Sequence, residues 1–442
     1  MHKFLLFLVM SIFFFIVGCG SESSNVHYPT YNTSINNDTE ECQNPNTITA
    51  VNPRPMLVIL VNYNNVSFQS NSSTWRKKIF GKSDHQLNDY YLEVSSNQFE
   101  FQQAMEDSGC ANDGIISINI DKNHPDIDIN NPAFAQNVYN DLKNALIATD
   151  NNVDFSNYDN DANGKITSNE LLLTFIIAGF EDAYESTHVT NGIWAHQYCM
   201  TESANSPTLD GVSLMGCQNG GNFALFGEKH DIAHPDDATI GIIAHELGHA
   251  TFNLPDLYNT QNVNSGGIGN FGLMGGGTWA QQNAIEYPGN TPVHFSAWSK
   301  IYNGWLNAST STGNVILHAS SSIDYNVVKI PINATSYYLL ENRGNNGYDK
   351  GLYSLTGNFN GGMALWKVDE TKLTAQHFDD NNVNADTQNK GVDLVEAQVG
   401  NIDSHGGGGD EDALYYEGNK NSFSTLITNI SQRGSSMSLN IN

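Results

Sequence analysis

Two histidines separated by three residues form the spacing in this sequence that most directly predicts chemistry. They lie in the run Ile242-Ile243-Ala244-His245-Glu246-Leu247-Gly248-His249. Residues four apart on an α-helix share one face, so His245 and His249 can direct two imidazole nitrogens at one zinc ion. Glu246 can then act on a water molecule as a general base. The pattern predicts metal-assisted hydrolysis of a peptide bond.

A catalytic zinc ion usually takes three protein ligands and keeps one open position. Asp256 is the expected third ligand, because a chain that leaves the helix near Asn253 can turn back toward the metal. Asparagine tolerates the left-handed conformation that such a turn needs. The alternative for Asp256 is a carboxylate that only caps a turn. Glu286, Asp231 and His294 are less favoured substitutes.

The elements that must position these residues are also indicated by the sequence. A helix is expected from about residue 237 to 252, with Pro235-Asp236-Asp237 at its start. After about residue 310, alternation and turns predict a β-rich C-terminal part. The other expected elements are a buried strand at 55–61, a helix and then a strand within 87–101, a helix at 134–148 with Val138, Leu142 and Leu146 four apart, and an apolar, strand-like run at 171–177.

A second metal site is predicted by residues 159–170, which match the spacing of a twelve-residue calcium loop. Gly164 occupies the sixth position, where the loop turns sharply. An Asx-rich turn without a metal is the alternative. The expected ligands are the side chains of Asp159, Asp161, Asn163 and Glu170, the carbonyl of Lys165, and Thr167 through a water molecule.

The first residues resemble an export signal. Lys3 precedes an apolar run, residues 4–17, which is shorter than the about 20 residues that span a bilayer. Residues 16–19 resemble the lipobox of bacterial lipoproteins, so Cys19 is the expected lipidation site and residues 1–18 the signal peptide. An ordinary secretory signal is the alternative. The protein is expected to be exported and anchored to a bacterial membrane by acyl chains, with the outer membrane or the cell surface as the favoured location.

Composition narrows the classes of function. The chain has 442 residues, 39% of them hydrophobic, which suffices for a large core and a smaller one. It carries 19 Lys and Arg against 47 Asp and Glu, for a net charge of -28. A polyanion repels phosphate, so no nucleic-acid partner is expected. Residues 19–53, which are rich in Ser, Asn, Thr and Pro, are expected to form a flexible tether.

Four cysteines remain after Cys19, and an even number in an exported chain permits two disulfides. Cys199 with Cys217 is the preferred pair, because it closes a short local loop. Cys42 and Cys110 are the other two, and free buried thiols are the alternative.

Several other polar residues have plainer interpretations. His230 and His234 are also four apart, but Pro235 directly follows the second histidine, which favours a surface or helix-entry role. His196 beside Trp194 is expected to be a packed, hydrogen-bonded core pair. Tyr258 and Tyr302 are both candidates for stabilising an oxyanion.

The zinc motif and its surroundings resemble the immune inhibitor A family of secreted bacterial metallopeptidases, which are similar to metzincins. The resemblance covers nearly everything after the tether. It is carried by the run from His245 to His249 with Leu254-Pro255-Asp256-Leu257-Tyr258, by Met56 to Val61, Asp89-Tyr90-Tyr91, Gln98 to Phe101, Ile193 to His196, Gly269 to Trp279, Pro292 to Trp305, Tyr338 to Arg343 and Leu365 to Asp369.

The resemblance implies an α+β fold: a zincin- or metzincin-like catalytic domain with a zinc-binding helix at residues 54–310, then a β-rich region at 311–442. It also implies the ligand roles given above and Met274 as a hydrophobic floor beneath the metal. Two departures are visible: Lys367 stands where a histidine is expected in the C-terminal motif, and the spacing after the second zinc-binding histidine differs. Metzincins place a glycine three residues after the second histidine, whereas here one extra residue is present and Asn253 takes the glycine's role.

Three candidate functions follow. The first is a zinc endopeptidase with Zn²⁺ as catalytic and Ca²⁺ as structural ion, acting on extracellular protein or peptide substrates. The second is a catalytically inactive, calcium-stabilised surface lipoprotein that binds partners. Glu246 favours the enzyme, because a binding protein has no need of a general base. A zinc hydrolase of non-peptide substrates is a third candidate, since the motif defines metal chemistry and not substrate.

Overall fold

The computed structural model describes residues 47–126, 132–184, 189–201, 206–262, 265–398, 402–403, 407–419 and 421–442, with the side chains of 132–135 and 355 excepted. The expected signal peptide, Cys19, Cys42 and most of the tether lie outside these residues. The helices are α1 Ser72–Phe80, α2 Leu87–Val94, α3 Pro132–Ala148, α4 Ile240–Phe252, α5 Ala297–Tyr302, α6 Leu352–Thr356 and α7 Ala375–Asp379.

The strands divide between two halves of the chain. The first half holds β1 Asn52–Tyr63, β2 Phe99–Gln103, β3 Ile115–Ile120, β4 Leu172–Glu181, β5 Gly192–Ile193, β6 His196–Tyr198, β7 Thr208–Leu209, β8 Val212–Ser213 and β9 Phe223–Lys229. The second half holds β10 Ser309–Thr310, β11 Gly313–His318, β12 Val328–Pro331, β13 Ser336–Arg343, β14 Gly362–Asp369, β15 Val392–Leu394, β16 Ile427–Thr428 and β17 Ser436–Ile441.

A mostly parallel sheet forms the frame of the first half. Its main order is β2-β1-β4-β9-β6, with β3 also paired to β1 and β5 to β4. The strands β2, β3 and β4 run parallel to β1, and β9 runs parallel to β4. The exception at the edge is β6, which is antiparallel to β9. A parallel sheet is covered on both faces, and the apolar runs of β1 and β4 are accordingly buried.

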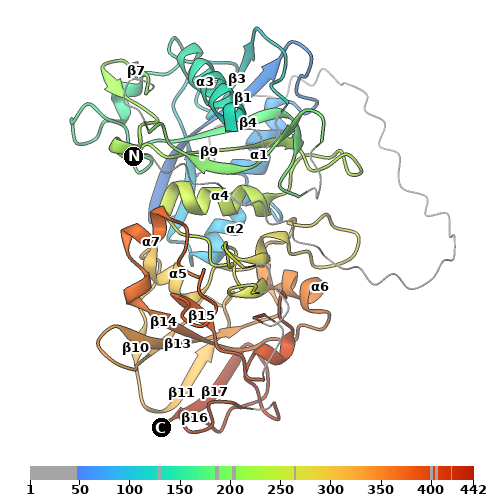
Figure 1. Cartoon of the computed structure of the whole chain (residues 1–442), viewed down its shortest axis with the longest axis vertical. Helices are drawn as coiled ribbons and strands as arrows, with labels where there is room; N and C mark the ends of the chain where they lie inside the picture. The colour runs from blue at the N-terminus through green and yellow to red at the C-terminus, as the bar shows by residue number, and fades with distance from the viewer. Residues whose placement is uncertain are drawn as a thin grey trace, which may run out of the picture.

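Alternate residues of β1 separate two hydrophobic cores. Val58 and Leu60 belong to one core with side chains of α1, α2 and α4, whereas Ile59 and Val61 belong to the other with side chains of α3. Figure 1 shows α3 above the sheet and α4 with α2 below it. The helix and strand expected within residues 87–101, and the helix expected at 134–148, are confirmed as α2, β2 and α3.

Two further sheets form the second half, in the lower part of Figure 1. One has the order β10-β12-β13-β14-β15 and the other β11-β17-β16. Leu339 and Trp366 of the five-stranded sheet belong to the same core as α4, so that core crosses residue 310. Leu340 and Leu365 face the three-stranded sheet in a third core. The mixture of helix and sheet is consistent with the expected α+β class.

The helix that carries the histidines begins later than expected. It starts at Ile240, with Thr239 as N-cap, and not near Asp237. The carboxylate of Asp237 accepts hydrogen bonds from Lys229 Nζ at 2.9 Å and from Ser70 Oγ at 2.6 Å. These contacts, with a backbone bridge between Lys229 and Asp237, hold this residue against β9 in a non-helical conformation.

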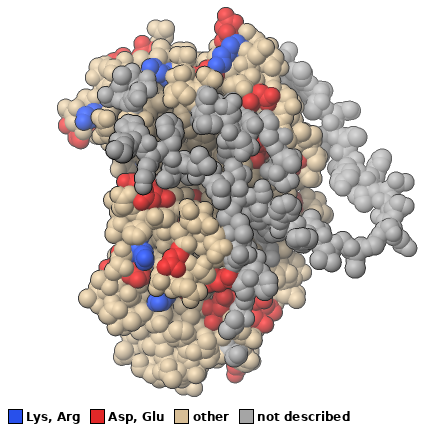
Figure 2. Space-filling model, viewed as in Figure 1, with Lys and Arg blue, Asp and Glu red and all other residues tan. Residues whose placement is uncertain are grey.

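Two features bear on the environment of the protein. Cys199 and Cys217 form the expected disulfide, and Cys110 is also disulfide-bonded. Among the described residues, no helix combines the length and the apolar character needed to cross a bilayer. On the face in Figure 2, acidic side chains are spread over the upper and lower parts, and basic ones are isolated.

Candidate metal centre and active site

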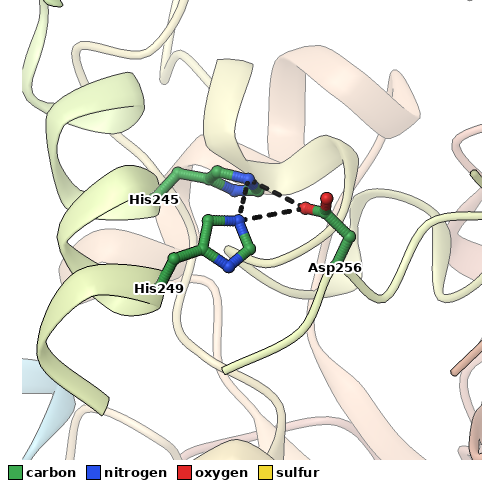
Figure 3. A group of neighbouring side chains, drawn as sticks. All are labelled: His245, His249 and Asp256. Carbon is green, nitrogen blue, oxygen red and sulfur yellow. Dashed lines mark hydrogen bonds and ion pairs between the residues drawn. The ribbon is translucent and has the colours of Figure 1, made fainter. Parts of the chain in front are cut away.

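The first two ligand candidates come from α4 and the third from the chain that follows it (Figure 3). Asp256 Oδ1 lies 3.0 Å from His245 Nε2 and 3.3 Å from His249 Nε2. The two Nε2 atoms are 3.2 Å apart. His245 and Asp256 are buried, and His249 is partly buried. The three residues therefore converge on one point at the edge of the core.

The spacing of these three atoms fits a tetrahedral ion. Zinc bonds of about 2.0–2.1 Å at tetrahedral angles separate the ligand atoms by about 3.3 Å. The three separations here are 3.0, 3.2 and 3.3 Å. Two imidazoles and one carboxylate are a donor set that zinc takes in catalytic sites, with the fourth position left for water or substrate. The residues present therefore fit a catalytic zinc ion.

Backbone carbonyls orient both imidazole rings. His245 Nδ1 lies 2.9 Å from the carbonyl oxygen of Leu273, and His249 Nδ1 lies 2.5 Å from that of Leu254. A hydrogen on Nδ1 makes each ring a donor to its carbonyl and leaves the lone pair on Nε2, which faces the proposed metal.

The turn after α4 brings Asp256 back to the helix. Asn253 is the C-cap, with φ 54° and ψ 34°, and its N–H bonds to the carbonyls of Gly248 and His249. This left-handed conformation is the one that was expected of Asn253. The extra residue relative to the metzincin spacing is therefore taken up in the turn, and Asp256 still reaches the histidines.

The electrostatics of the three residues favour positive charge. Burial alone raises the pKa of Asp256, but the charge of protonated His249 and the close contacts of Asp256 Oδ1 with both histidine rings hold this pKa far below its usual range. Burial acts in the opposite direction on His249, whose pKa is nevertheless raised to about 9 by Asp256. A buried carboxylate that attracts a proton to neighbouring imidazoles also attracts a divalent cation there.

Glu246 lies beside this group and is itself buried, with 7% of its surface exposed. Burial raises the pKa of its carboxyl group, although the charges of His245 and His249 oppose the shift. The backbone N–H of Gln197, in the edge strand β6, donates a hydrogen bond to the carboxylate. A carboxylate with a raised pKa is a better proton acceptor, as a general base requires.

A second buried carboxylate, which sequence reasoning missed, lies near Glu246. Glu181 is fully buried at the end of β4 and accepts hydrogen bonds from the N–H groups of Ala183, Ala195 and Gly227 at 2.9–3.0 Å. Burial raises the pKa of Glu181 to about 8, and the charge of Glu246 adds to the rise. No motif marks this residue, because its three partners come from three separate segments.

Met274 is buried beneath the helix, with 1% exposed. A Cβ added at Gly248 would lie 2.9 Å from Met274 Sδ. The sulfur therefore lies close to α4 at Gly248, a residue between His245 and His249 in the sequence. The carbonyl of Met274 accepts the N–H of Leu257 at 2.7 Å. This turn therefore contacts both the helix and the segment that carries Asp256.

Residues 48–308 match the family described as immune inhibitor A peptidase M6, catalytic domain. The match covers more than half of the chain. The chain belongs to this family. The resemblance found in the sequence is therefore confirmed, and His245, His249 and Asp256 lie within the matched residues.

Individual relatives match shorter segments. "Immune inhibitor A" of Bacillus thuringiensis subsp. alesti is 32% identical over 184 residues, which are 38% of this chain and 25% of that protein. "Pre-pro-metalloprotease PrtV" of Vibrio cholerae serotype O1 is 29% identical over 179 residues, 36% of this chain and 18% of the relative. The matched part thus spans a quarter or less of these relatives.

A solved structure, wild-type OgpA from Akkermansia muciniphila, aligns with 76% of this chain and 89% of its own. The identity is 11% and the TM-score 0.30, a likeness too weak to support a conclusion about this M6 chain.

The other candidate ligands lie apart from the candidate metal centre of this M6 chain. Glu286 bonds to Gln282 and Thr291, Asp231 bonds to His234, and His294 Nε2 bonds to Glu93. The structure therefore groups Asp256, and none of these three, with the two helix histidines.

The two tyrosines proposed for an oxyanion differ in their contacts. Tyr258 hydrogen-bonds to Asp256, and burial with the charge of Asp256 raises the pKa of its hydroxyl well above its ordinary value. Tyr302 bonds to Asn253 and is 44% exposed. His196 is held as expected, with Nδ1 on the Trp194 carbonyl and Nε2 on the Tyr139 hydroxyl.

The predicted calcium loop brings three carboxylates together. Three carboxylate oxygens, one from each of Asp159, Asp161 and Glu170, lie within 4.8 Å of one another. Gly164 has φ 75°, and its N–H donates to Asp159 Oδ2 at 2.9 Å. The other three predicted ligands lie in the same loop: Asn163 bonds to Asp159 and Asp161, Thr167 bonds to Glu170, and Lys165 forms a backbone bridge to Ser213.

Proposed function

We propose that this protein is a zinc-dependent endopeptidase that hydrolyses peptide bonds of extracellular proteins. The observation that supports this most directly is the mutual spacing of 3.0–3.3 Å between His245 Nε2, His249 Nε2 and Asp256 Oδ1, with Glu246 beside them. Membership of a peptidase family supports the reaction class. The name of one relative, a metalloprotease, agrees with it.

The roles of the residues follow from their positions. His245, His249 and Asp256 would hold the zinc ion. When bound, zinc lowers the pKa of water from about 15.7 toward 7 and polarises a carbonyl group. The carboxylate of Glu246 accepts a proton from the attacking water and returns it to the departing amine. The Gln197 N–H holds this carboxylate in place from β6. Met274 forms an apolar floor beneath the histidines.

Digestion of casein by purified protein tests the proposal. Wild type reconstituted with zinc is expected to cleave casein, and a zinc chelator should abolish cleavage. Glu246→Gln should bind zinc normally and lose at least about a hundredfold in kcat, the share that general-base catalysis supplies. Glu417→Gln, a change at an exposed glutamate in the other half of the chain, serves as the control and should remain fully active.

Two results would count against the enzyme. Full activity of Glu246→Gln would remove the assigned base. A zinc-loaded wild type that cleaves no protein substrate would favour the inactive, partner-binding lipoprotein.

We also propose that the protein is exported and held at a bacterial membrane by a lipid on Cys19. The support is the sequence of residues 4–19 and the tether that follows. Cys19→Ser should release the protein into the soluble fraction of fractionated cells. Unchanged membrane partitioning would contradict the anchor.

We further propose a structural calcium ion in the loop 159–170. Its support is the ligand spacing together with the approach of Asp159, Asp161 and Glu170. Ile166, which follows Lys165, is buried and its N–H donates to the Ser213 carbonyl at 2.9 Å. The loop is therefore tied to β8 and not to a second calcium loop, which fits a structural role more than a sensor.

A further inference from the structure

Asn381, in the second half of the chain, binds the proposed third zinc ligand at two points. Its side-chain Nδ2 donates to Asp256 Oδ2 at 2.6 Å, and its Oδ1 accepts the backbone N–H of Asp256 at 3.1 Å. The two residues are separated by 125 positions in sequence. One side chain therefore fixes both the backbone and the carboxylate of Asp256.

The two oxygens of Asp256 have different partners. Oδ1 faces the nitrogens of His245 and His249, and Oδ2 faces the amide of Asn381. A carboxylate that binds a metal through one oxygen can rotate about its Cβ–Cγ bond. A donor on the second oxygen stops that rotation and keeps the first oxygen directed at the metal.

Asn381 belongs to a segment that closes over the chain leaving the active-site helix. We call residues 381–390 the C-terminal clasp. Four hydrogen bonds join the C-terminal clasp to the chain between residues 257 and 267: Thr260 Oγ1 to Asn381 O at 2.7 Å, Asn384 Nδ2 to Leu257 O at 2.7 Å, Asn259 Nδ2 to Ala385 O at 3.2 Å, and Lys390 Nζ to Gly267 O at 3.0 Å.

The conformation of Asn381 is itself fixed by its neighbours. Its φ is 46°, a left-handed value that asparagine tolerates better than most residues. Its N–H donates to the carbonyl of Phe378 at 3.0 Å, at the end of α7. The Phe378 ring lies 6.4 Å from that of Trp298 and 5.7 Å from that of Tyr302, both in α5. The amide is thus held before any metal binds.

We propose that Asn381 is a positioning residue for the zinc site, acting through Asp256, and that the catalytic unit therefore extends beyond residue 310. This proposal rests on the proposed zinc peptidase function. Asn381 lies outside the segment 48–308 that matches the M6 catalytic domain. Hydrogen-bond partners of metal ligands typically contribute a factor of 10–100 in metal affinity or activity.

The test compares two matched substitutions in the clasp. Asn381→Gly removes both bonds to Asp256 and tolerates the positive φ. Asn384→Gly makes the same chemical change three residues away and removes the bond to the Leu257 carbonyl, but leaves the carboxylate of Asp256 with its partner. Asn381→Ala is the second variant if Asn381→Gly folds poorly. Zinc dissociation constants are measured by competition with a chromophoric chelator, with melting temperatures alongside.

Asn381→Gly is expected to weaken zinc binding by about 10–100-fold. In zinc-saturated protein it should lower kcat for a peptide substrate more than it raises KM. Asn384→Gly should lower the melting temperature as much or more, because Asn384 is the more deeply buried of the two, yet change zinc affinity less than about threefold.

Three outcomes would overturn the assignment. Wild-type zinc affinity in Asn381→Gly or Asn381→Ala would remove Asn381 from the site and leave the peptidase function intact. Equal losses in the two glycine variants would mean that the clasp acts only through stability. A wild type that binds no zinc would overturn both this proposal and the proposed function.

Discussion

At the scale of single residues, Asp256 connects the two halves of the molecule. It faces two imidazoles from α4 through one oxygen and an amide from the C-terminal clasp through the other. The place of Asp256 beside the histidines can be predicted from the sequence, because Asp256 follows His249 by only seven residues and the turn at Asn253 is local. The contact of Asp256 with Asn381 cannot be predicted in this way, because nothing in the order of the residues indicates a contact across 125 positions.

His230 gives a residue-scale prediction about pH. It is fully buried between Tyr184 and Tyr287, and its ring is parallel to that of Tyr287, with 2° between the planes. Neither ring nitrogen has a hydrogen-bond partner within the described part of the chain. Burial lowers the pKa of His230 to about 4, although the charge of Asp231 opposes the shift. The buried ring is therefore neutral at pH 7.

The sign of the effect follows from the lowered pKa. In the unfolded chain, histidine takes up a proton near pH 6.5, whereas the folded protein resists protonation of His230 down to about pH 4. The contribution to stability is complete above pH 6.5 and is lost as the pH falls toward 4. By this linkage the loss amounts to about 2 kcal/mol at pH 5.

Replacing His230 with phenylalanine keeps an aromatic ring between the two tyrosines and removes the titration. The free energy of unfolding of His230→Phe minus that of wild type is the quantity to follow. This difference should be about 2 kcal/mol larger at pH 5 than at pH 7.5. Urea unfolding at both pH values measures this, with zinc removed from both proteins. An equal difference at the two pH values would show that His230 does not titrate in this way.

At the scale of elements, the position of α4 depends on a close approach to the turn that contains Met274. Gly241, in the first turn of α4, donates its N–H to the Gly289 carbonyl at 2.8 Å. A Cβ at this position would lie 2.0 Å from the Thr278 carbonyl oxygen and 2.9 Å from Gly289 Cα. Both atoms are backbone, so they cannot move aside as a side chain does.

Gly241→Ala is therefore expected to destabilise the protein by about 1–3 kcal/mol and to weaken zinc binding, since His245 lies one turn further along α4. Helix propensity alone predicts the opposite sign, a gain of about 1 kcal/mol for alanine. Gly434→Ala is the control, because its nearest contact would be an ordinary 3.6 Å. Thermal melting and chelator competition give both quantities. A Gly241→Ala protein as stable as wild type would refute the close approach.

The loop 159–170 is the second element that carries a prediction. Calcium that binds only the folded protein stabilises it by about 2.7 kcal/mol at a hundredfold excess over the dissociation constant. Calcium added to EGTA-dialysed protein that has been resupplied with zinc should therefore raise the melting temperature. Glu170→Gln, which removes one of the grouped carboxylates, should not respond. A melting temperature that calcium leaves unchanged in wild type would remove the site.

The elements also show where sequence reasoning succeeds. The strand β1, the helix α3 and the histidine-bearing part of α4 follow from local apolar patterns, because one or both faces of each must be covered. The predicted start of α4 near Asp237 is too early, because Lys229 and Ser70 bind the carboxylate of Asp237 away from the helix. Glu181 was missed for a similar reason: its partners are assembled by the sheet and not by the chain order.

At the scale of the whole molecule, the two halves of the chain share one hydrophobic core. Leu247 of α4, Leu339 of β13 and Trp366 of β14 belong to it together. Arg343, fully buried at the end of β13, donates to the carbonyl of Phe271 in the first half and forms an ion pair with Asp349. Contacts of this kind tie the β-rich region to the turn beside the proposed metal site.

A shared core predicts that the halves unfold together. Scanning calorimetry of the intact chain should show a single transition for the folded part, with calorimetric and van't Hoff enthalpies in agreement. Arg343→Met should lower that one transition as a whole, because the change leaves Asp349 buried without its partner. The shared core would be contradicted if calorimetry showed two separate transitions and Arg343→Met shifted only one of them.

The central claim, that the helix histidines and Asp256 form a zinc site, is tested most directly by metal analysis. Purified protein is reconstituted, dialysed against metal-free buffer and measured by inductively coupled plasma mass spectrometry. The account predicts one zinc per chain in wild type and in Glu246→Gln, and substantially less than one in His249→Ala. A folded wild type that retains no stoichiometric zinc, or a His249→Ala protein that retains as much as wild type, would contradict it.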